Sequence, residues 1–144
     1  MVHAVPVLHA LRSARPDAQL AWAIQPEFAD LVRPLEGLER LFLFDRGGGL
    51  RAWLRLRREL RAWNADWSVD AQGNHKSAAV TWCSGARVRH GPAPQDWQEP
   101  LGARRLTHAA PPSYGVHAVH KVTALLERVA PDQKLSFDLE LDPA

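Results

Sequence analysis

The amino-acid sequence predicts an α/β fold in which helices cover both faces of a parallel sheet. Short apolar runs alternate along the chain with longer segments of helical periodicity, which is the arrangement of βαβ units. The 144 residues have the length of one domain. Their composition, 46% hydrophobic and 24% charged, is typical of globular proteins and excludes an intrinsically disordered chain.

Six segments have the periodicity or the terminal signals of helices. The clearest is 50–63, because Trp53, Leu56, Leu60 and Trp63 form one narrow stripe along it. The other predicted helices are 2–15, 26–32, 75–83, 98–105 and 117–129. Proline stands in the first turn or just beyond the end of several of them, as helix boundaries favour.

Four short apolar runs bounded by turn residues are predicted as strands. They are 18–24, 38–44, 66–70 and 87–90. Residues 91–113 contain five prolines, and apart from the helical piece at 98–105 we expect them to be irregular. Apolar and polar residues alternate over 135–141, as they would in an exposed strand or a linker.

Composition also limits the compartment and the chemistry. A single cysteine, Cys83, excludes an internal disulfide framework and a multi-cysteine zinc site. No run reaches the roughly 18 to 20 apolar residues of a membrane-spanning helix, and residues 1–11 lack the basic start of a signal peptide. We therefore expect a soluble, cytoplasmic protein. Its net charge is +2, and its 18 basic residues are mainly clustered arginines, so an anionic partner is an option.

The strand-to-helix turn at 70–77 is the most polar one in the chain. Ligands of parallel α/β sheets bind beyond the carboxyl ends of the strands, where such turns lie. Gly73 permits close approach of a backbone, Lys76 brings a positive charge, and Gln72 can both donate to and accept from a sugar hydroxyl. The alternative is a turn whose polar residues merely cap the following helix.

Four motifs in these segments have the order and approximate spacing of a known family. They are VHAVPVL at 2–8, DAQG at 70–73 with KSA at 76–78, EPL at 99–101, and HAV at 117–119. On these motifs the chain resembles the lipopolysaccharide heptosyltransferases of glycosyltransferase family 9, over nearly its whole length. The resemblance is greatest to the heptosyltransferase I type, which transfers L-glycero-D-manno-heptose from ADP-heptose to Kdo of the inner core.

This resemblance implies a Rossmann-like sheet that forms the N-terminal, acceptor-binding half of a GT-B fold. Residues 1–131 would be that partial domain, and 132–144 the start of a linker towards a C-terminal donor domain. The implied partners are a lipid A–Kdo acceptor and, once a donor domain is supplied, ADP-heptose, with no nucleic acid. The resemblance implies no cofactor and no metal, and a cytoplasmic location with peripheral inner-membrane association as an option.

The chain also departs from the family pattern. In the family, a β-strand and a Gly-Asp pair precede the position aligned with Met1, and the aspartate is the expected general base. Because that aspartate would precede Met1, we expect no catalytic residue within the chain, and an isolated chain that is inactive. Gln98 and His120 replace the family's usual arginine and glutamate. In a doubly wound sheet the first strand is central, so the strands at 18–24 and 66–70 would each lack a neighbour, unless they pair directly or a second copy fills the gap.

Residue chemistry and resemblance together give a set of candidate acceptor-binding residues. They are His3, Arg51, Arg55, Arg58, Gln72, Gly73, Lys76 and His117. The arginines suit carboxylates and phosphates through bidentate hydrogen bonds, although they can equally form a solvated helix face. His3 can instead cap its helix, and His117 with His120 lacks a third ligand for a metal.

Among the tryptophans, Trp97 is the candidate for stacking on a sugar, and the other five are expected in the core by their periodicity. Cys83 is expected to be a small buried side chain. A second hypothesis from another class is a non-catalytic α/β module that binds an anionic polymer or lipid surface through the arginine-rich helix. A third is a degenerate gene remnant without function.

Overall fold

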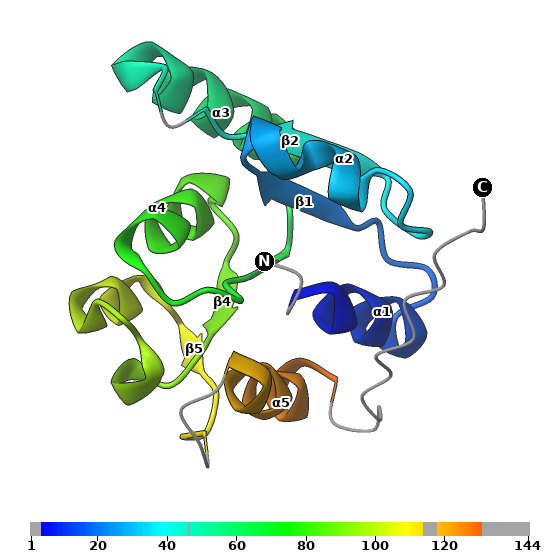
Figure 1. The fold of residues 1–144 in the computed structure, drawn as a ribbon, viewed down its shortest axis with the longest axis vertical. Helices are drawn as coiled ribbons and strands as arrows, with labels where there is room; N and C mark the ends of the chain where they lie inside the picture. Colours follow the sequence, from blue (N-terminus) through cyan, green and yellow to red (C-terminus); the bar gives the residue numbers. More distant parts are fainter. Residues whose placement is uncertain (1–3, 46, 114–117, 131–144) are drawn as a thin grey trace.

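The computed structural model describes residues 4–45, 47–113 and 118–130, and the helices and strands below lie in these parts. The α/β architecture predicted from the sequence is confirmed (Figure 1). Every strand pairing is parallel, and helices pack on both faces of the strands.

Several sequence-based predictions fall on residues outside the described ranges. These are the candidate site residues His3 and His117, the predicted linker at 132–144 and the segment 135–141. Met1, ahead of which the family resemblance places the catalytic aspartate, also lies outside the described residues. The placement of the general base therefore stays a prediction.

The strands form two separate parallel sheets. The first pairs β1 (Ala21–Ile24) with β2 (Arg40–Leu43), and Trp22 lies opposite Leu41. The second has the order β3 (Trp67–Val69), β4 (Val88–Gly91), β5 (His108–Ala109). The prediction that residues 106–113 are irregular is wrong at β5, because Thr107 and Ala110 donate backbone hydrogen bonds to β4 at 3.0 and 2.8 Å.

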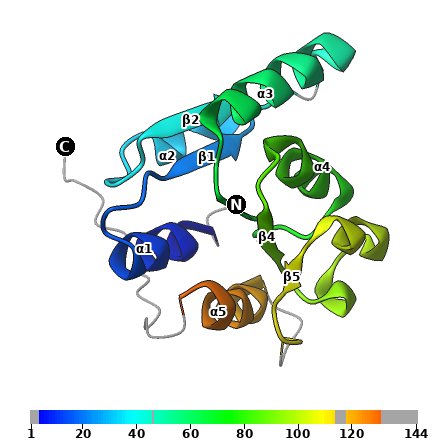
Figure 2. The ribbon, with the colours of Figure 1, turned by 180° about the vertical axis from the view of Figure 1, so that it is seen from behind.

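The break between the two sheets falls between β1 and β3, the two strands for which a missing neighbour was expected. In the described part of the chain, β1 and β3 each pair with one neighbour and do not pair with each other. Figures 1 and 2 show the β1–β2 pair and the β4–β5 region as separate ribbons with α1 and α5 lying along them. Arg12 of α1 contacts the segments that lead into β1 and β2, where its guanidinium donates to the carbonyl of Ala18 at 2.8 Å and to the Glu39 carboxylate at 2.6 Å.

The helices lie where the sequence predicts them, with two corrections. They are α1 (Val5–Ala14), α2 (Ala29–Val32), α3 (Gly49–Trp63), α4 (His75–Ser84) and α5 (Ala118–Val129). Three short 3-10 segments accompany them, η2 (Pro26–Phe28), η3 (Pro94–Asp96) and η4 (Pro100–Arg105). The predicted α-helix at 26–32 is thus 3-10 in its first half, and the helical piece near 98–105 is a 3-10 segment.

Alternation along the strands places helices on opposite faces of the first sheet. Phe42 and Phe44 pack with Leu56 and Leu60 of α3. Ile24 packs with Val32 of α2 and lies on the other face. The predicted stripe of α3 is therefore confirmed, with its leucines buried and its tryptophans half-buried.

A further core lies between α1 and α5, beside the second sheet. Leu125 is fully buried there, together with Val7 of α1 and Leu126 and Val129 of α5. Val69 of β3 packs against this cluster. This cluster therefore joins α1 and α5 to the second sheet through β3.

Candidate functional site

The turn after β3 is held from the inside by Asp70. This residue is 2% exposed, and its Oδ1 accepts hydrogen bonds from the backbone N–H groups of Gln72 and Gly73 at 2.8 and 2.9 Å. Burial raises the pKa of the Asp70 carboxyl, and these hydrogen bonds oppose the rise. Among the described residues, Asp70 Oδ2 has no hydrogen-bond partner. Asp70 therefore shapes the turn and does not face solvent.

The first N–H groups of α4 are already occupied by acceptors. Asn74 Oδ1 accepts from the N–H groups of Lys76 and Ser77 at 3.0 and 2.9 Å, and Ser77 Oγ accepts from Asn74 N–H at 3.1 Å, which is a capping box. The Glu99 carboxylate accepts from His75 N–H at 2.6 Å. These donors are satisfied within the chain, so a ligand here must bind through side chains.

The buried side chain of Trp97 packs against this turn. It is 5% exposed, and its indole N–H donates to the carbonyl of Pro92 at 2.9 Å. Gly73 has a φ of +70°, and a Cβ there would lie 3.5 Å from Trp97 Cγ. The prediction that Trp97 is available for sugar stacking is wrong. The chain folds back at this point, where Gln98 N–H donates to the Gly73 carbonyl at 3.0 Å, and the Trp97 ring is buried against the turn.

The exposure of the other tryptophans also departs from the prediction. Trp67 and Trp82 are 39% and 44% exposed, although periodicity placed them in the core. Arginine guanidinium groups lie over their rings, Arg15 at 4.9 Å over Trp67 and Arg105 at 4.7 Å over Trp82. Cation–π contacts of this kind stabilise aromatic rings at the surface.

The structure brings three of the predicted site residues together. Gln72 and Lys76 are exposed on the turn, and Gly73 is buried beneath them. Arg51, Arg55 and Arg58 are exposed on α3, where Arg55 pairs with Glu59 at 2.8 Å, and no described hydrogen bond or ion pair joins them to the turn. The turn and the α3 arginines are thus two separate basic features.

Sequence reasoning missed the residues that build the turn. Asp70, Asn74, Trp97 and Glu99 hold it, and none of them is a predicted acceptor-binding residue. The capping box was visible as Asn74 followed by Ser77 three positions later. The contact of Glu99 with His75 spans 24 positions and leaves no local signal.

Two further features of the chain bear on its chemistry, Cys83 and the grouping of possible metal ligands. Cys83 is buried as predicted, and burial raises the pKa of its thiol against the opposing charges of nearby arginines. In residues 4–45, 47–113 and 118–130, no group of three or more His, Cys, Asp or Glu side chains is placed to hold a metal ion. None of the helices in these ranges is long and apolar enough to cross a membrane.

Parallel strands covered on both faces, with a polar turn at the carboxyl end of β3, define a Rossmann-like half domain. The sequence model of glycosyltransferase family 9 (heptosyltransferase) matches residues 53–143. The chain belongs to this family, as the sequence motifs predicted.

Curated relatives are similar over most of this chain. Lipopolysaccharide heptosyltransferase 1 of Pseudomonas aeruginosa is 28% identical over 134 residues, which cover 87% of this chain and 38% of the relative. Lipopolysaccharide heptosyltransferase 1 of Escherichia coli K12 is 28% identical over 139 residues, covering 86% and 43%. The chain thus spans about two fifths of the length of these relatives.

Solved structures share the fold. The E. coli heptosyltransferase WaaC with ADP-2-deoxy-2-fluoro heptose has a TM-score of 0.77 at 24% identity, covering 94% of this chain and 47% of that one. The family 9 glycosyltransferase of Veillonella parvula has a TM-score of 0.73 at 18% identity, with 94% and 39% coverage. At these identities the likeness establishes the fold alone.

Proposed function

We propose that this chain forms the acceptor-binding half of a heptosyltransferase that transfers L-glycero-D-manno-heptose from ADP-heptose to Kdo of the lipopolysaccharide inner core. The observation that carries the proposal is the turn at 70–77, where exposed Gln72 and Lys76 stand on a backbone fixed by buried Asp70. Membership of the heptosyltransferase family and the names of the relatives support the substrate class.

In this reaction an acceptor hydroxyl attacks the anomeric carbon of the donor as the bond to ADP breaks, with inversion. The hydroxyl proton passes to a general base, and the departing diphosphate needs a cationic or hydrogen-bonding clamp. We assign the base to the family aspartate expected ahead of Met1, and the clamp to the donor domain. The chain described here would supply walls of the acceptor site.

The two exposed side chains suit a sugar acid. The Lys76 ammonium can attract the Kdo carboxylate as a point charge, and the Gln72 amide can donate to and accept from hydroxyl groups. The side-chain oxygens of Asp70, Asn74 and Glu99 accept hydrogen bonds from the backbone N–H groups beneath them and fix that backbone, so little ordering is required when the acceptor binds.

A direct test is titration of the 144-residue chain with a deacylated Kdo disaccharide, monitored by calorimetry. Lys76→Ala should weaken binding by about 10- to 100-fold, since a charge-assisted hydrogen bond contributes roughly 1.5 to 3 kcal/mol. Arg33→Ala is the matched control, because Arg33 is an exposed cation at the end of α2, paired with Asp30 at 3.2 Å. Equal losses in the two variants would contradict the proposal.

Transfer itself requires the joined enzyme. In a protein that links this chain to a family 9 donor domain, Lys76→Ala should lower kcat/KM for the acceptor and leave the KM for ADP-heptose nearly unchanged. A comparable loss of donor binding would show that Lys76 belongs to the other side of the cleft. The isolated chain should give no heptose transfer, and turnover by the purified chain would refute the assignment of the base ahead of Met1.

A further inference from the structure

A buried histidine lies on the face of the second sheet that the α1–α5 core covers. His90 of β4 is 4% exposed, and the parallel register places it between Val69 of β3 and His108 of β5. Val69 packs against the α1–α5 core, and residues of one lateral row share a face of the sheet. Helix α5 contacts β4, and Figure 2 shows it beside β4 and β5. His90 is therefore enclosed between the sheet and α5.

Neither nitrogen of the His90 ring has a hydrogen-bond partner among the described residues. The ring packs instead against two other rings, with centres 4.9 Å away at Trp67 and 5.2 Å away at His108. Buried polar groups in folded proteins are nearly always hydrogen-bonded. This imidazole therefore indicates a partner that the described part of the chain does not supply.

Basic side chains gather around this histidine at one edge of the sheet. Connecting helices run opposite to the strands of a parallel sheet, so they end at the edge where the strands begin. Arg128 is in the last turn of α5, Arg15 directly follows α1, and Trp67 and His108 are the first residues of β3 and β5. The Arg15 guanidinium lies 4.9 Å from the centre of the Trp67 ring. We call Arg15, Trp67, His90, His108 and Arg128 the His90 cluster, and it lies at the edge opposite to the candidate turn.

The charge of the His90 cluster is positive. Burial, followed by the charges of His108 and Arg128, lowers the pKa of His90 to about 4, so its ring is neutral at neutral pH. Asp66 and Glu127 are exposed carboxylates next to the cluster in sequence, and no ion pair of the described residues joins either of them to it. A metal cation is disfavoured, because the arginines repel it and no third metal-binding side chain joins the two histidines within the described ranges.

Two donors of the cluster can be reached from solvent beside β5. Arg128 is exposed and His108 is half-buried. Thr107 Oγ1 lies 2.8 Å from His108 Nδ1, so Nε2 is the nitrogen of that ring that can bind a ligand. Positive donors without an acidic partner, above a buried imidazole, suit a small anion with several oxygen atoms.

We propose that the His90 cluster binds a small inorganic oxyanion, such as phosphate or sulfate, between β4, β5 and α5. The Arg128 guanidinium and the His108 imidazole would donate hydrogen bonds from the solvent side, and His90 would donate from beneath after taking up a proton. Anion binding and proton uptake are linked, because the buried imidazolium gains a counter-ion.

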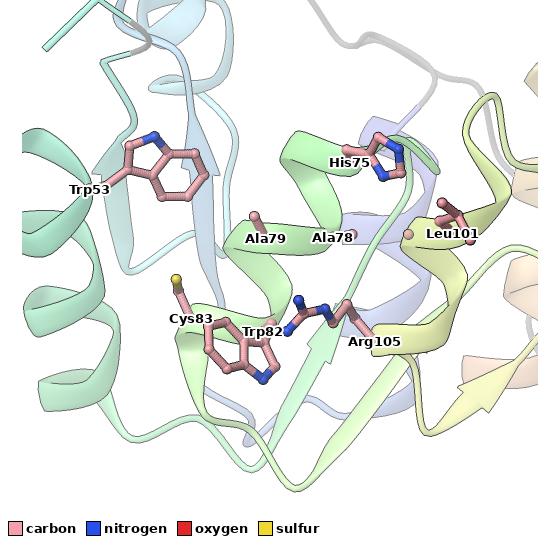
Figure 3. Close-up of a pocket in the computed structure, with 9 residues that line it drawn as sticks. Trp53, His75, Ala78, Ala79, Trp82, Cys83, Leu101 and Arg105 are labelled. Atoms are coloured by element: carbon pink, nitrogen blue, oxygen red, sulfur yellow. The ribbon is translucent and has the colours of Figure 1, made fainter. Parts of the chain in front are cut away.

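The opposite face of β4 carries a separate feature. Arg89 alternates with His90 along the strand and donates to the Arg105 carbonyl of η4 at 2.6 Å. A cavity of about 500 Å³ lies between α3, α4 and η4, and Trp53, Trp82 and Arg105 are among its lining residues (Figure 3). Of the buried side-chain atoms that lack a hydrogen bond in the described residues, none belongs to this lining. The His90 cluster is therefore distinct from this cavity.

Sulfate titration of the 144-residue chain, followed by NMR of the imidazole signals at constant ionic strength, tests this inference independently of the proposed heptose transfer. Sulfate keeps the same charge between pH 5 and pH 8, so a change in its affinity reports on the protein. The affinity should rise by about tenfold or more from pH 8 to pH 5, because binding is coupled to proton uptake. The His90 ring should take up its proton at a higher pH with sulfate than without it.

Three variants locate the site. His90→Phe keeps a ring in the stack with Trp67 and should remove the dependence of sulfate affinity on pH. Arg128→Gln should weaken binding by about tenfold at both pH values, since a charge-assisted hydrogen bond is lost. Arg87→Gln is the matched control, because Arg87 is an exposed cation directly before β4 and alternation places it on the face opposite to His90. It should bind sulfate like the original chain.

Sulfate affinity that is equal at pH 5 and pH 8 would overturn the proposal. Equal losses in Arg87→Gln and Arg128→Gln would do the same, because binding would then be general charge attraction. If the circular dichroism spectrum shows that His90→Phe does not fold, the original chain decides. A His90 signal that titrates identically with and without sulfate would refute the site.

Discussion

The effects of substituting Gly102 and Trp97 on stability should be strongly coupled. The Trp97 ring, which packs under the candidate turn, leaves no room for a side chain at Gly102. A Cβ placed on Gly102 would lie 2.4 Å from Trp97 Cζ3 and 2.8 Å from Cε3, well inside contact distance. The ring cannot move easily, since it is buried and its indole N–H is bonded to the Pro92 carbonyl. Gly102→Ala should therefore lower the free energy of unfolding by about 1 to 3 kcal/mol, the usual cost of overpacking.

A double-mutant cycle measured by urea unfolding at neutral pH separates this clash from other effects. Trp97→Ala by itself should destabilise by roughly 3 to 5 kcal/mol, as for other truncations of a large aromatic ring in a core. In that background the added methyl group no longer meets the ring and keeps a close contact with Ala78 Cβ at 3.3 Å, so Gly102→Ala should cost about 0.5 kcal/mol or less. The coupling between the two positions should thus be at least about 0.5 kcal/mol.

Gly47→Ala is the control for a glycine without such a neighbour. The nearest heavy atom to its added Cβ is Asp45 Oδ1 at 3.5 Å, so its effect should stay within about 0.5 kcal/mol. If Gly102→Ala costs the same with and without the Trp97 ring, the packing argument for the turn is wrong.

Two further predictions concern stability. Burial, with the charges of His108 and Arg128, lowers the pKa of His90 to about 4. As the pH falls, His90 therefore takes up a proton in the unfolded chain before it does so in the folded one, and the free energy of unfolding decreases between about pH 6.5 and pH 4. His90→Phe should remove most of this decrease when unfolding is measured at pH 7 and at pH 5. Joining an apolar, β-branched segment of about 10 to 15 residues ahead of residue 1 should raise the free energy of unfolding by several kcal/mol, because the edges of β1 and β3 that have no partner among the described residues would gain one. Equal stability of the extended and original chains in urea would show that the two sheets need no strand between them.

Local patterns in the sequence were sufficient for the helices and most strands. The stripe of α3 was visible at 50–63, and the structure has Gly49–Trp63. Periodicity works here because burial of one helix face depends on residues three and four positions apart, which a sequence shows directly. The family motifs at 70–73 and 76–78 likewise located the polar turn without any knowledge of its contacts.

The short elements depend on partners that are distant along the chain. β5 has two residues, His108–Ala109, and is a strand because β4 lies beside it. Nothing in the composition of 91–113, rich in proline, distinguishes those two residues from their neighbours. Pairing between strands is a tertiary contact, so propensity alone carries little information about such a short strand.

Neighbouring residues are enough to establish the α/β class, the helical faces, the family and the location of the polar turn, because each of these is a local pattern. Which side chains remain available for binding follows from packing instead. Trp97 is removed from the candidate site by its contacts with Gly73 and Gly102, and Glu99 occupies the N-terminus of α4 from 24 positions away. Exposure is a property of the packed neighbours of a side chain, and those neighbours are set by the fold rather than by adjacency in the chain.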